Sequence, residues 1–342
     1  MSGSTVSKKS VEDYLGEGEK RFFAAGYRRV AYRFGDIVAE VRDDRRGLLA
    51  TSIRLSCPDG WSHKAARGAL RPHLSTIDAI LLAGQLGELY LTHACHLDEQ
   101  ARRRIWIRKL KIKAGASPDE ELEQVPVSTR PVAASGDSSV VVLESRIGAM
   151  RTQCEFAGVT GEPNVGTTTY SGPEQLLGPA ENRYYGTGFT GREQRLGDLS
   201  LDLPRRRATA AVTCAGDGGD SGLEGAYQPA PTFVDLFATS LQLAQILLYE
   251  TDSMSRGESN TLWMRSTQLT AESPHRTFGG AMPLRTELHD LGLLTMNGAP
   301  WRTADIHAGL GGITLRCAVA HALPPGATAI PSEIISTAAE SR

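Results

Sequence analysis

The chain has 342 residues, and 37 Lys and Arg against 39 Asp and Glu give it a formal net charge of −2. With this balance no overall electrostatic field favours binding to nucleic acid or to an anionic membrane surface. Five cysteines without a C-x-x-C pair disfavour a disulfide framework and a structural zinc site, and no apolar segment of a signal peptide follows the N-terminus. We therefore expect a cytoplasmic protein of about two domains that binds neither nucleic acid nor membrane.

The first predicted elements form a hairpin followed by a helix. Residues 36–41 and 48–57 alternate apolar and polar side chains around the turn Asp-Asp-Arg-Arg-Gly, as half-buried strands do. An apolar run of helix length follows at 75–93, and Ser75-x-x-Asp78 at its start has the form of a capping box. Further strands of this part are predicted at 104–113 and 139–146.

Residues 114–139 are rich in Pro, Ser and Glu and show no apolar face, so we expect a mobile surface loop there. The same order of elements then returns. A second hairpin is predicted at 198–214, and a second apolar helix begins at Thr232-x-x-Asp235. Strands follow at 261–270 and 312–320.

The two halves are copies of one another at the level of single residues. At an offset of 162, residues 12–35 fall on 174–197 with matching Glu, Leu, Gly and Arg. At an offset of 157, the segment IDAILLAGQLGELYL falls on VDLFATSLQLAQILL without a gap. Chance does not place Cys, Pro, Trp and Arg together so often, so we infer an internal duplication. The matched pairs at the second offset include Cys57 and Cys214, Pro72 and Pro229, Trp106 and Trp263, and Arg108 and Arg265.

One central helix and a curled antiparallel sheet in each copy predict an α+β protein with two tandem hotdog units. Two such units side by side would share one continuous sheet over a buried pair of helices. The predicted parts are a disordered N-terminus at 1–10, a first unit at 11–160, a linker at 161–172, a second unit at 173–323 and a flexible tail at 324–342.

The candidate chemistry lies on the two apolar helices. Asp78 and Gln85 are seven residues apart and therefore share one stripe of the first helix, and Asp235 and Gln242 repeat this on the second. Polar groups on a buried face need partners or a function. Capping of the helix start is an alternative reason for both aspartates, and the two roles can coexist.

His63 precedes Asp78 by fifteen residues, and its counterpart in the second copy is Asp220. This arrangement resembles hotdog dehydratases, in which a loop histidine acts with a helix carboxylate of the partner unit. The resemblance implies a site that joins His63 to Asp235, with Asp78 and Asp220 vestigial or structural. A solvated loop histidine is the alternative.

His93 and His96 have a possible metal-ligand spacing, but they lie where the first helix ends, and the second copy preserves neither. We expect no metal and no cofactor.

The segment VEDYLGEGEKRFFAAGYRRVAYRF near the N-terminus resembles the AvrD family, bacterial proteins that direct production of syringolide-type signals. The resemblance extends over most of the chain. It implies a synthase that joins a β-ketoacyl thioester, carried by coenzyme A or a carrier protein, to a ketose such as xylulose. The butyrolactone synthases of the AfsA type are related and use a similar reaction. The product would be a butenolide, formed by acyl transfer, ring closure and loss of water.

In this reading His63 is the base, Asp235 is the acid or orienting partner, and the amides of a helix N-terminus hold the oxyanion. A hotdog thioesterase or dehydratase would use the same residues, and a non-catalytic ligand-binding protein is a second alternative. The predicted catalytic residues are His63, Asp235, Asp78 and Gln242. The predicted substrate-binding residues are Gln85 and Thr239, with Leu82, Leu86, Phe237 and Leu241 lining an acyl tunnel between the helices.

Overall fold

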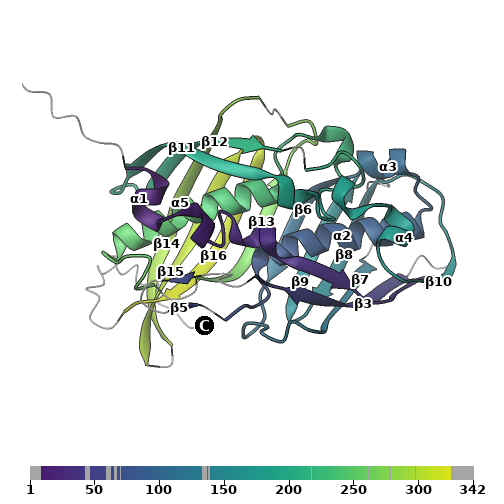
Figure 1. The fold of residues 1–342 in the computed structure, drawn as a ribbon, viewed down its shortest axis with the longest axis horizontal. Helices are drawn as coiled ribbons and strands as arrows, with labels where there is room; N and C mark the ends of the chain where they lie inside the picture. Colours follow the sequence, from purple (N-terminus) through teal and green to yellow (C-terminus); the bar gives the residue numbers. More distant parts are fainter. Residues whose placement is uncertain are drawn as a thin grey trace, which may run out of the picture.

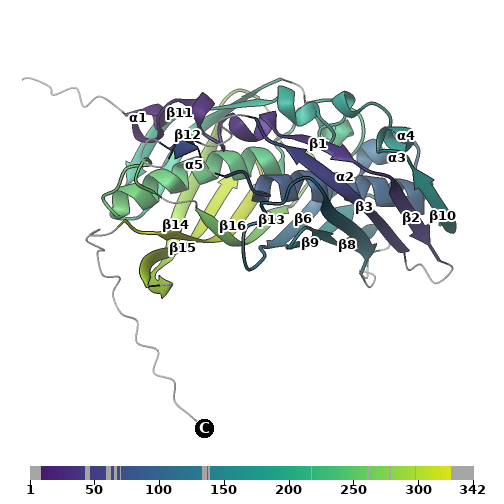
Figure 2. The same cartoon turned by 60° about the horizontal axis from the view of Figure 1, so that its bottom comes forward.

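The computed structural model is a large antiparallel sheet with two long helices on one of its faces (Figure 1). Viewed from another side, the middle of the sheet runs beneath both helices and its two ends curve up past them (Figure 2). No helix in the part that the structure describes is long and apolar enough to cross a membrane. The structure describes residues 9–42, 47–58, 63–64, 68–69, 71–132, 137, 139–216, 218–259, 262–276, 279–296 and 298–324.

The elements fall into two successive groups. The helices are α1 (Val11–Leu15), α2 (Thr76–Ala94), α3 (Glu99–Arg104), α4 (Glu174–Leu177) and α5 (Phe233–Thr251). The strands of the first group are β1 (Ala31–Phe34), β2 (Ile37–Val41), β3 (Gly47–Ser56), β4 (His63–Lys64), β5 (Gly68–Ala69), β6 (Trp106–Lys113), β7 (Val125–Pro131), β8 (Val140–Ile147), β9 (Met150–Ala157) and β10 (Gly166–Tyr170). Those of the second group are β11 (Glu193–Asp202), β12 (Arg207–Ala215), β13 (Trp263–Ala271), β14 (Met282–Met296), β15 (Ala299–Leu310) and β16 (Ile313–Ala322).

The two halves of the sheet repeat one strand order. The first half runs β2-β3-β7-β8-β9-β6, and the second runs β11-β12-β14-β15-β16-β13. The innermost strands β6 and β13 pair antiparallel, with Leu110 opposite Leu269, so the two halves form one sheet. The predicted hairpins are both present, as β2-β3 and β11-β12. The internal duplication read from the sequence therefore corresponds to two halves of the same topology.

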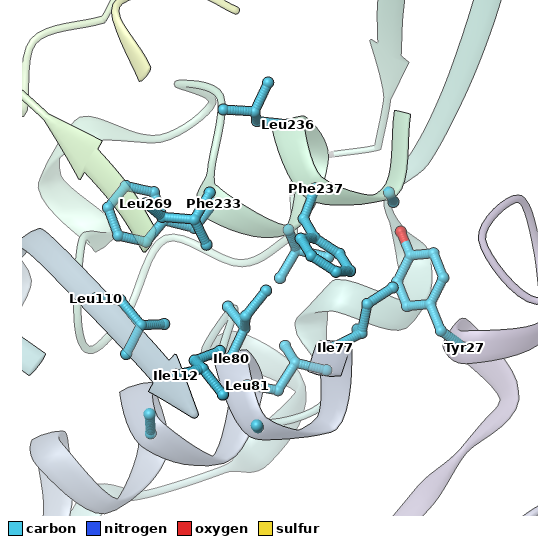
Figure 3. Packing of buried hydrophobic residues seen from close by; sticks show 14 of the residues in the cluster. Tyr27, Ile77, Ile80, Leu81, Leu110, Ile112, Phe233, Leu236, Phe237 and Leu269 are labelled. Atoms are coloured by element: carbon cyan, nitrogen blue, oxygen red, sulfur yellow. The ribbon is translucent and has the colours of Figure 1, made fainter. Parts of the chain in front are cut away.

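The two long helices form the centre of the core. Every residue of α2 is buried, which is the pattern of a helix that is surrounded by protein. The capping boxes predicted at Ser75 and Asp78 and at Thr232 and Asp235 are both confirmed. The N-terminal halves of the two helices meet where Ile80 of α2 lies near Phe237 of α5 (Figure 3).

Residues 114–139 are not only the surface loop that we predicted. The segment contains β7, which pairs with β3 on one side and β8 on the other. Val125, Val127 and Thr129 alternate toward the core, but two prolines and acidic neighbours hid this alternation of three positions. The predicted linker at 161–172 likewise contains β10, which pairs with β2.

Two glycines of α2 allow aromatic rings to reach the helix backbone. A Cβ atom at Gly87 would collide with the ring of Phe156, and one at Gly84 would collide with the ring of Tyr185. Glycine lowers helix propensity at both positions, so the packing of the two rings compensates for an intrinsic cost. Close packing of the second half's Tyr185 and the first half's sheet on α2 depends on these two positions.

We expect Gly87→Ala to destabilise the protein by about 1–3 kcal/mol, because overpacking outweighs the gain in helix propensity of about 1 kcal/mol. The midpoint of urea unfolding measures this change. Gly197→Ala is the matched control, since nothing lies within 4 Å of a Cβ atom there. An unfolding midpoint for Gly87→Ala at or above that of the unmodified protein would contradict the packing described.

Candidate functional site

A cavity of about 360 Å³ lies at the N-terminus of α2, beside the C-terminal half of α5. Elements of both halves form its walls, so it is a composite site. Apolar side chains make most of the lining: Phe22, Phe23, Leu74, Met150, Leu262, Trp263, Met264 and Trp301. The polar groups of the lining include Arg21, His73, Ser75, Thr76, Ser117, Asp119, Gln245 and Arg256.

The start of α2 presents a fixed helix end to this cavity. Ser75 and Thr76 line it, and Asp78 holds the turn by accepting from the Ser75 amide at 2.7 Å. The Tyr32 hydroxyl donates to the same carboxylate at 2.5 Å. Burial raises the pKa of Asp78, and the hydrogen bonds from Tyr32 and Ser75 oppose this shift. The first amides of a helix lack intrahelical acceptors and carry the positive end of the helix dipole, so this wall suits a developing negative charge.

Among the described residues, one histidine lines the cavity, His73. It lies two residues before the N-cap Ser75, and its side chain is half-buried. Sequence reasoning passed over His73, although its place directly before a capping box was a visible signal. Its counterpart in the second half is Ala230, so the repeat itself marks His73 as a difference between the two halves.

Gln242 of α5 positions two of the lining residues. Its side-chain oxygen accepts from Nη1 of Arg21 at 2.7 Å, and its amide nitrogen donates to the Phe23 carbonyl at 3.2 Å. Arg21 also donates to Glu12 at 2.8 Å. Through these contacts α5 fixes the segment at 21–23 against the cavity.

At the N-terminus of α5, a buried ion pair is found where the N-terminus of α2 faces the cavity. Asp235 and Arg192 are both fully buried, with Nη2 of Arg192 at 3.0 Å from Oδ2 of Asp235. Gln194 donates to the other carboxylate oxygen at 2.7 Å, and the Thr232 amide donates to Oδ2 at 2.7 Å. Tyr27 of the first half donates to Gln194 at 2.8 Å, so the network also joins the two halves.

At the start of α5, buried charged side chains occupy the place that corresponds to the cavity at the start of α2. Arg276 forms an ion pair with Glu224 at 3.1 Å, and both are buried. Arg276 also donates to the Pro231 carbonyl just before the α5 N-cap, and Tyr185 donates to Glu224 at 3.1 Å. The two halves therefore share a backbone topology but not a site: one helix start is open and the other is packed.

The two matched cysteines are not suited to nucleophilic catalysis. Burial raises the pKa of Cys57 to about 11 and the pKa of Cys214 to about 12, with the nearby aspartate of each helix adding to the shift. Both thiols are therefore protonated at neutral pH, and the thiolate is the reactive form.

A family model described as "Pseudomonas avirulence D protein (AvrD)" matches residues 6–324. The chain belongs to the AvrD family. This confirms the resemblance drawn from the N-terminal segment, and it covers both halves. No curated protein matches the chain.

Among solved structures, this AvrD-family protein is similar to a protein of unknown function with hot dog fold from Alicyclobacillus acidocaldarius. The identity is 10%, the alignment covers 89% of this chain and 98% of that chain, and the TM-score is 0.39. The acyl-CoA thioesterase II TesB2 of Mycobacterium marinum gives 11% identity, coverage of 84% and 96%, and a TM-score of 0.35. The dehydratase domain of PpsC from Mycobacterium tuberculosis gives 12%, coverage of 85% and 98%, and 0.39.

The predicted site residues of this AvrD-family protein are not all in one place. His63 lies in β4, and its side chain is outside the described residues. Asp220, its counterpart, is exposed and lies 3.9 Å from Arg103. Asp235 lines neither of the two cavities described.

Most of the predicted substrate-binding residues lie in packed core. Thr239 is fully buried and donates to the Asp235 carbonyl at 2.6 Å. Gln85 lines a smaller cavity of about 180 Å³ beside Tyr32 and Pro173. The four side chains expected to line an acyl tunnel are fully buried, and none lines either cavity: Leu82, Leu86, Phe237 and Leu241.

Proposed function

We propose that this AvrD-family protein is a condensing synthase that joins a β-ketoacyl thioester to a ketose such as xylulose. The observation that carries the proposal is the composite cavity at the start of α2. It combines apolar walls for an acyl chain, a helix end for an oxyanion and a histidine for proton transfer. The proposal includes the assignment of each half as a hotdog unit, because each half packs one helix on one antiparallel sheet.

The first step is acyl transfer. A histidine at the cavity takes the proton of a sugar hydroxyl, and the hydroxyl oxygen attacks the thioester carbonyl. Amides at the start of α2 stabilise the negative charge on the carbonyl oxygen. Collapse of this intermediate forms the ester and releases the thiol, which takes up the proton. His73 is our first candidate for the base because it lines the cavity, and His63 stays a candidate for the same role.

The second step closes the ring. The carbon between the two carbonyls of the β-ketoacyl group is acidic, and its carbanion adds to the ketone of the bound sugar. Loss of one water molecule then gives the butenolide. The same histidine serves for the proton transfers, and the apolar side chains of the wall limit the access of water, which would otherwise hydrolyse the ester. Arg21 and Gln245 supply hydrogen bonds for the polar end of the sugar.

We expect thiol release from a β-ketoacyl thioester to depend on added xylulose. The product should have the mass of the simple sugar ester less one water molecule. Thiol titration gives the rate and mass spectrometry gives the product. Glucose at the same concentration is the control for a nonspecific effect of sugar.

Thiol release at one rate with and without xylulose would make the protein a thioesterase and end the synthase proposal. Formation of an α,β-unsaturated acyl product from a β-hydroxyacyl thioester would favour a dehydratase. Absence of any turnover, together with binding of the thioester, would favour the ligand-binding alternative.

A further inference from the structure

The smaller cavity, of about 180 Å³, lies beside the middle of α2 and against the segment that leads into α4. Gln85 of α2 lines it, and only 5% of this residue is exposed. The Gln85 side chain forms no hydrogen bond with any residue that the structure describes. Buried side-chain amides normally have partners, so this cavity offers an unused donor and an unused acceptor.

Glu174, the first residue of α4, lines the same cavity and is exposed. Its carboxylate forms no ion pair with a cation in the described part of the chain. The two side chains therefore give the cavity one neutral and one charged acceptor.

The second long helix shows what fills the equivalent place. Gln242 and Glu12 are the counterparts of Gln85 and Glu174 at the two repeat offsets. Nη1 of Arg21 donates to Gln242 at 2.7 Å, and Nη2 donates to Glu12 at 2.8 Å. Helix α1, which carries Glu12, packs on α5 as α4 packs on α2. In that half one guanidinium therefore joins the glutamine to the glutamate.

The counterpart of Arg21 is Arg183, which takes a different partner. Its Nη1 lies 3.6 Å from the carboxylate of Glu88, and both side chains are buried. The repeat has the uncharged Gln245 where α2 has Glu88, so Arg21 has no such competing carboxylate. Glu88 therefore accounts for the position of Arg183, and the cavity lies where a guanidinium would otherwise bind.

We propose that the smaller cavity binds a small guanidinium compound, in the place that the guanidinium of Arg21 fills in the other half. One of its nitrogens donates to the side-chain oxygen of Gln85 and another to the carboxylate of Glu174, which the planar fork of donors allows. The inference does not depend on the proposed reaction, because Gln85 and Glu174 have no part in it.

Arg33 also lines this cavity and is exposed. Its counterpart Arg195 pairs with Glu193 at 3.2 Å, whereas Ala31 takes the place of that glutamate in the first half. We therefore expect Arg33 to weaken the binding of a cation, by a small factor because solvent and salt screen its charge.

The test titrates the whole protein with methylguanidinium and with methylurea, an uncharged molecule of similar shape. Calorimetry should show binding of methylguanidinium and about tenfold weaker binding of methylurea. Gln85→Met should raise Kd for methylguanidinium about tenfold, because a charge-assisted hydrogen bond to a buried amide is lost. Glu174→Gln should raise it about three- to fivefold, since the attraction of an exposed carboxylate is screened. Glu181→Gln removes another exposed carboxylate of the same segment from outside the lining, and this matched control should leave Kd unchanged.

Arg33→Gln separates a cation from other polar ligands. It should lower Kd for methylguanidinium about twofold, because it removes a like charge from the lining. A rise in Kd would mean that the ligand accepts from Arg33, and it would overturn the assignment.

Three further results would overturn it: no binding of methylguanidinium, equally tight binding of methylurea, or an equal rise in Kd for Glu174→Gln and its control. Glu174 is exposed, so this variant keeps the test decisive even if the buried Gln85 does not tolerate replacement. Tighter binding of N-acetyl-arginine amide than of methylguanidinium would assign the cavity to an arginine side chain of a partner protein instead of a small molecule.

Discussion

Asp235→Asn is expected to destabilise the protein by about 3–5 kcal/mol, because it leaves Arg192 buried without a counter-ion. Both side chains are fully buried, and the guanidinium contacts both carboxylate oxygens. Arg192 has further acceptors in the carbonyls of Pro229 and Ala230, at 3.1 Å each, but these carry no full charge. Asparagine keeps an oxygen for the helix cap, so the loss reports the ion pair more than the cap.

The unfolding midpoint in urea measures this loss, and Asp202→Asn is the matched control. Asp202 forms an exposed ion pair with Arg205 at 3.0 Å, and such surface pairs contribute little to stability. The sequence hypothesis gives Asp235 a role in the reaction instead. A variant that unfolds like the control but loses turnover would establish that role and contradict the structural one.

The repeat and the helix starts could be predicted because they depend on local patterns. Ser75-x-x-Asp78 and Thr232-x-x-Asp235 each satisfy orphan amides within one turn, so the capping boxes form wherever the helices do. The continuous sheet was expected from two units side by side, and the pairing of β6 with β13 forms it. The strand β7 was not predicted, because only three alternating positions of it face the core.

The difference between the two helix starts could not be predicted from either half alone. Asp78 and Asp235 occupy the same position in identical caps, but the first accepts from Tyr32 and the second from Arg192 and Gln194. At the repeat offset of 162, Arg192 corresponds to Val30. An arginine in place of an apolar residue next to a helix start was a visible sign of an ion pair. Its partner, however, lies 43 residues away, and periodicity does not report such contacts.

The open cavity escaped sequence reasoning for a related reason. Its walls come from segments as far apart as Arg21 and Trp301, and volume left between such segments depends on their packing. One substitution inside the repeat did carry information. Gln245 lines the cavity, while its counterpart Glu88 lies 3.6 Å from Arg183 in a buried ion pair. Comparison of the two halves for lost charges would have placed the open site at α2.

The second large effect is expected from His73. We expect His73→Gln to lower kcat for xylulose-dependent thiol release by about 10²–10⁴-fold, the usual contribution of a general base. Glutamine keeps a polar side chain of similar size at the cavity wall but takes no proton at neutral pH. Because His73 is only half-buried, its replacement should leave the unfolding midpoint close to that of the unmodified protein.

His63→Gln and His275→Gln complete this test. His275 belongs to the second half, where it is exposed and lies against the ring of Tyr227, so its replacement should leave kcat unchanged. If His63→Gln lowers kcat while His73→Gln does not, the base is His63 and His73 is only part of the wall. The pH profile separates the two roles further, since loss of the base removes the acidic limb of kcat, whereas loss of a wall contact shifts KM and leaves that limb in place.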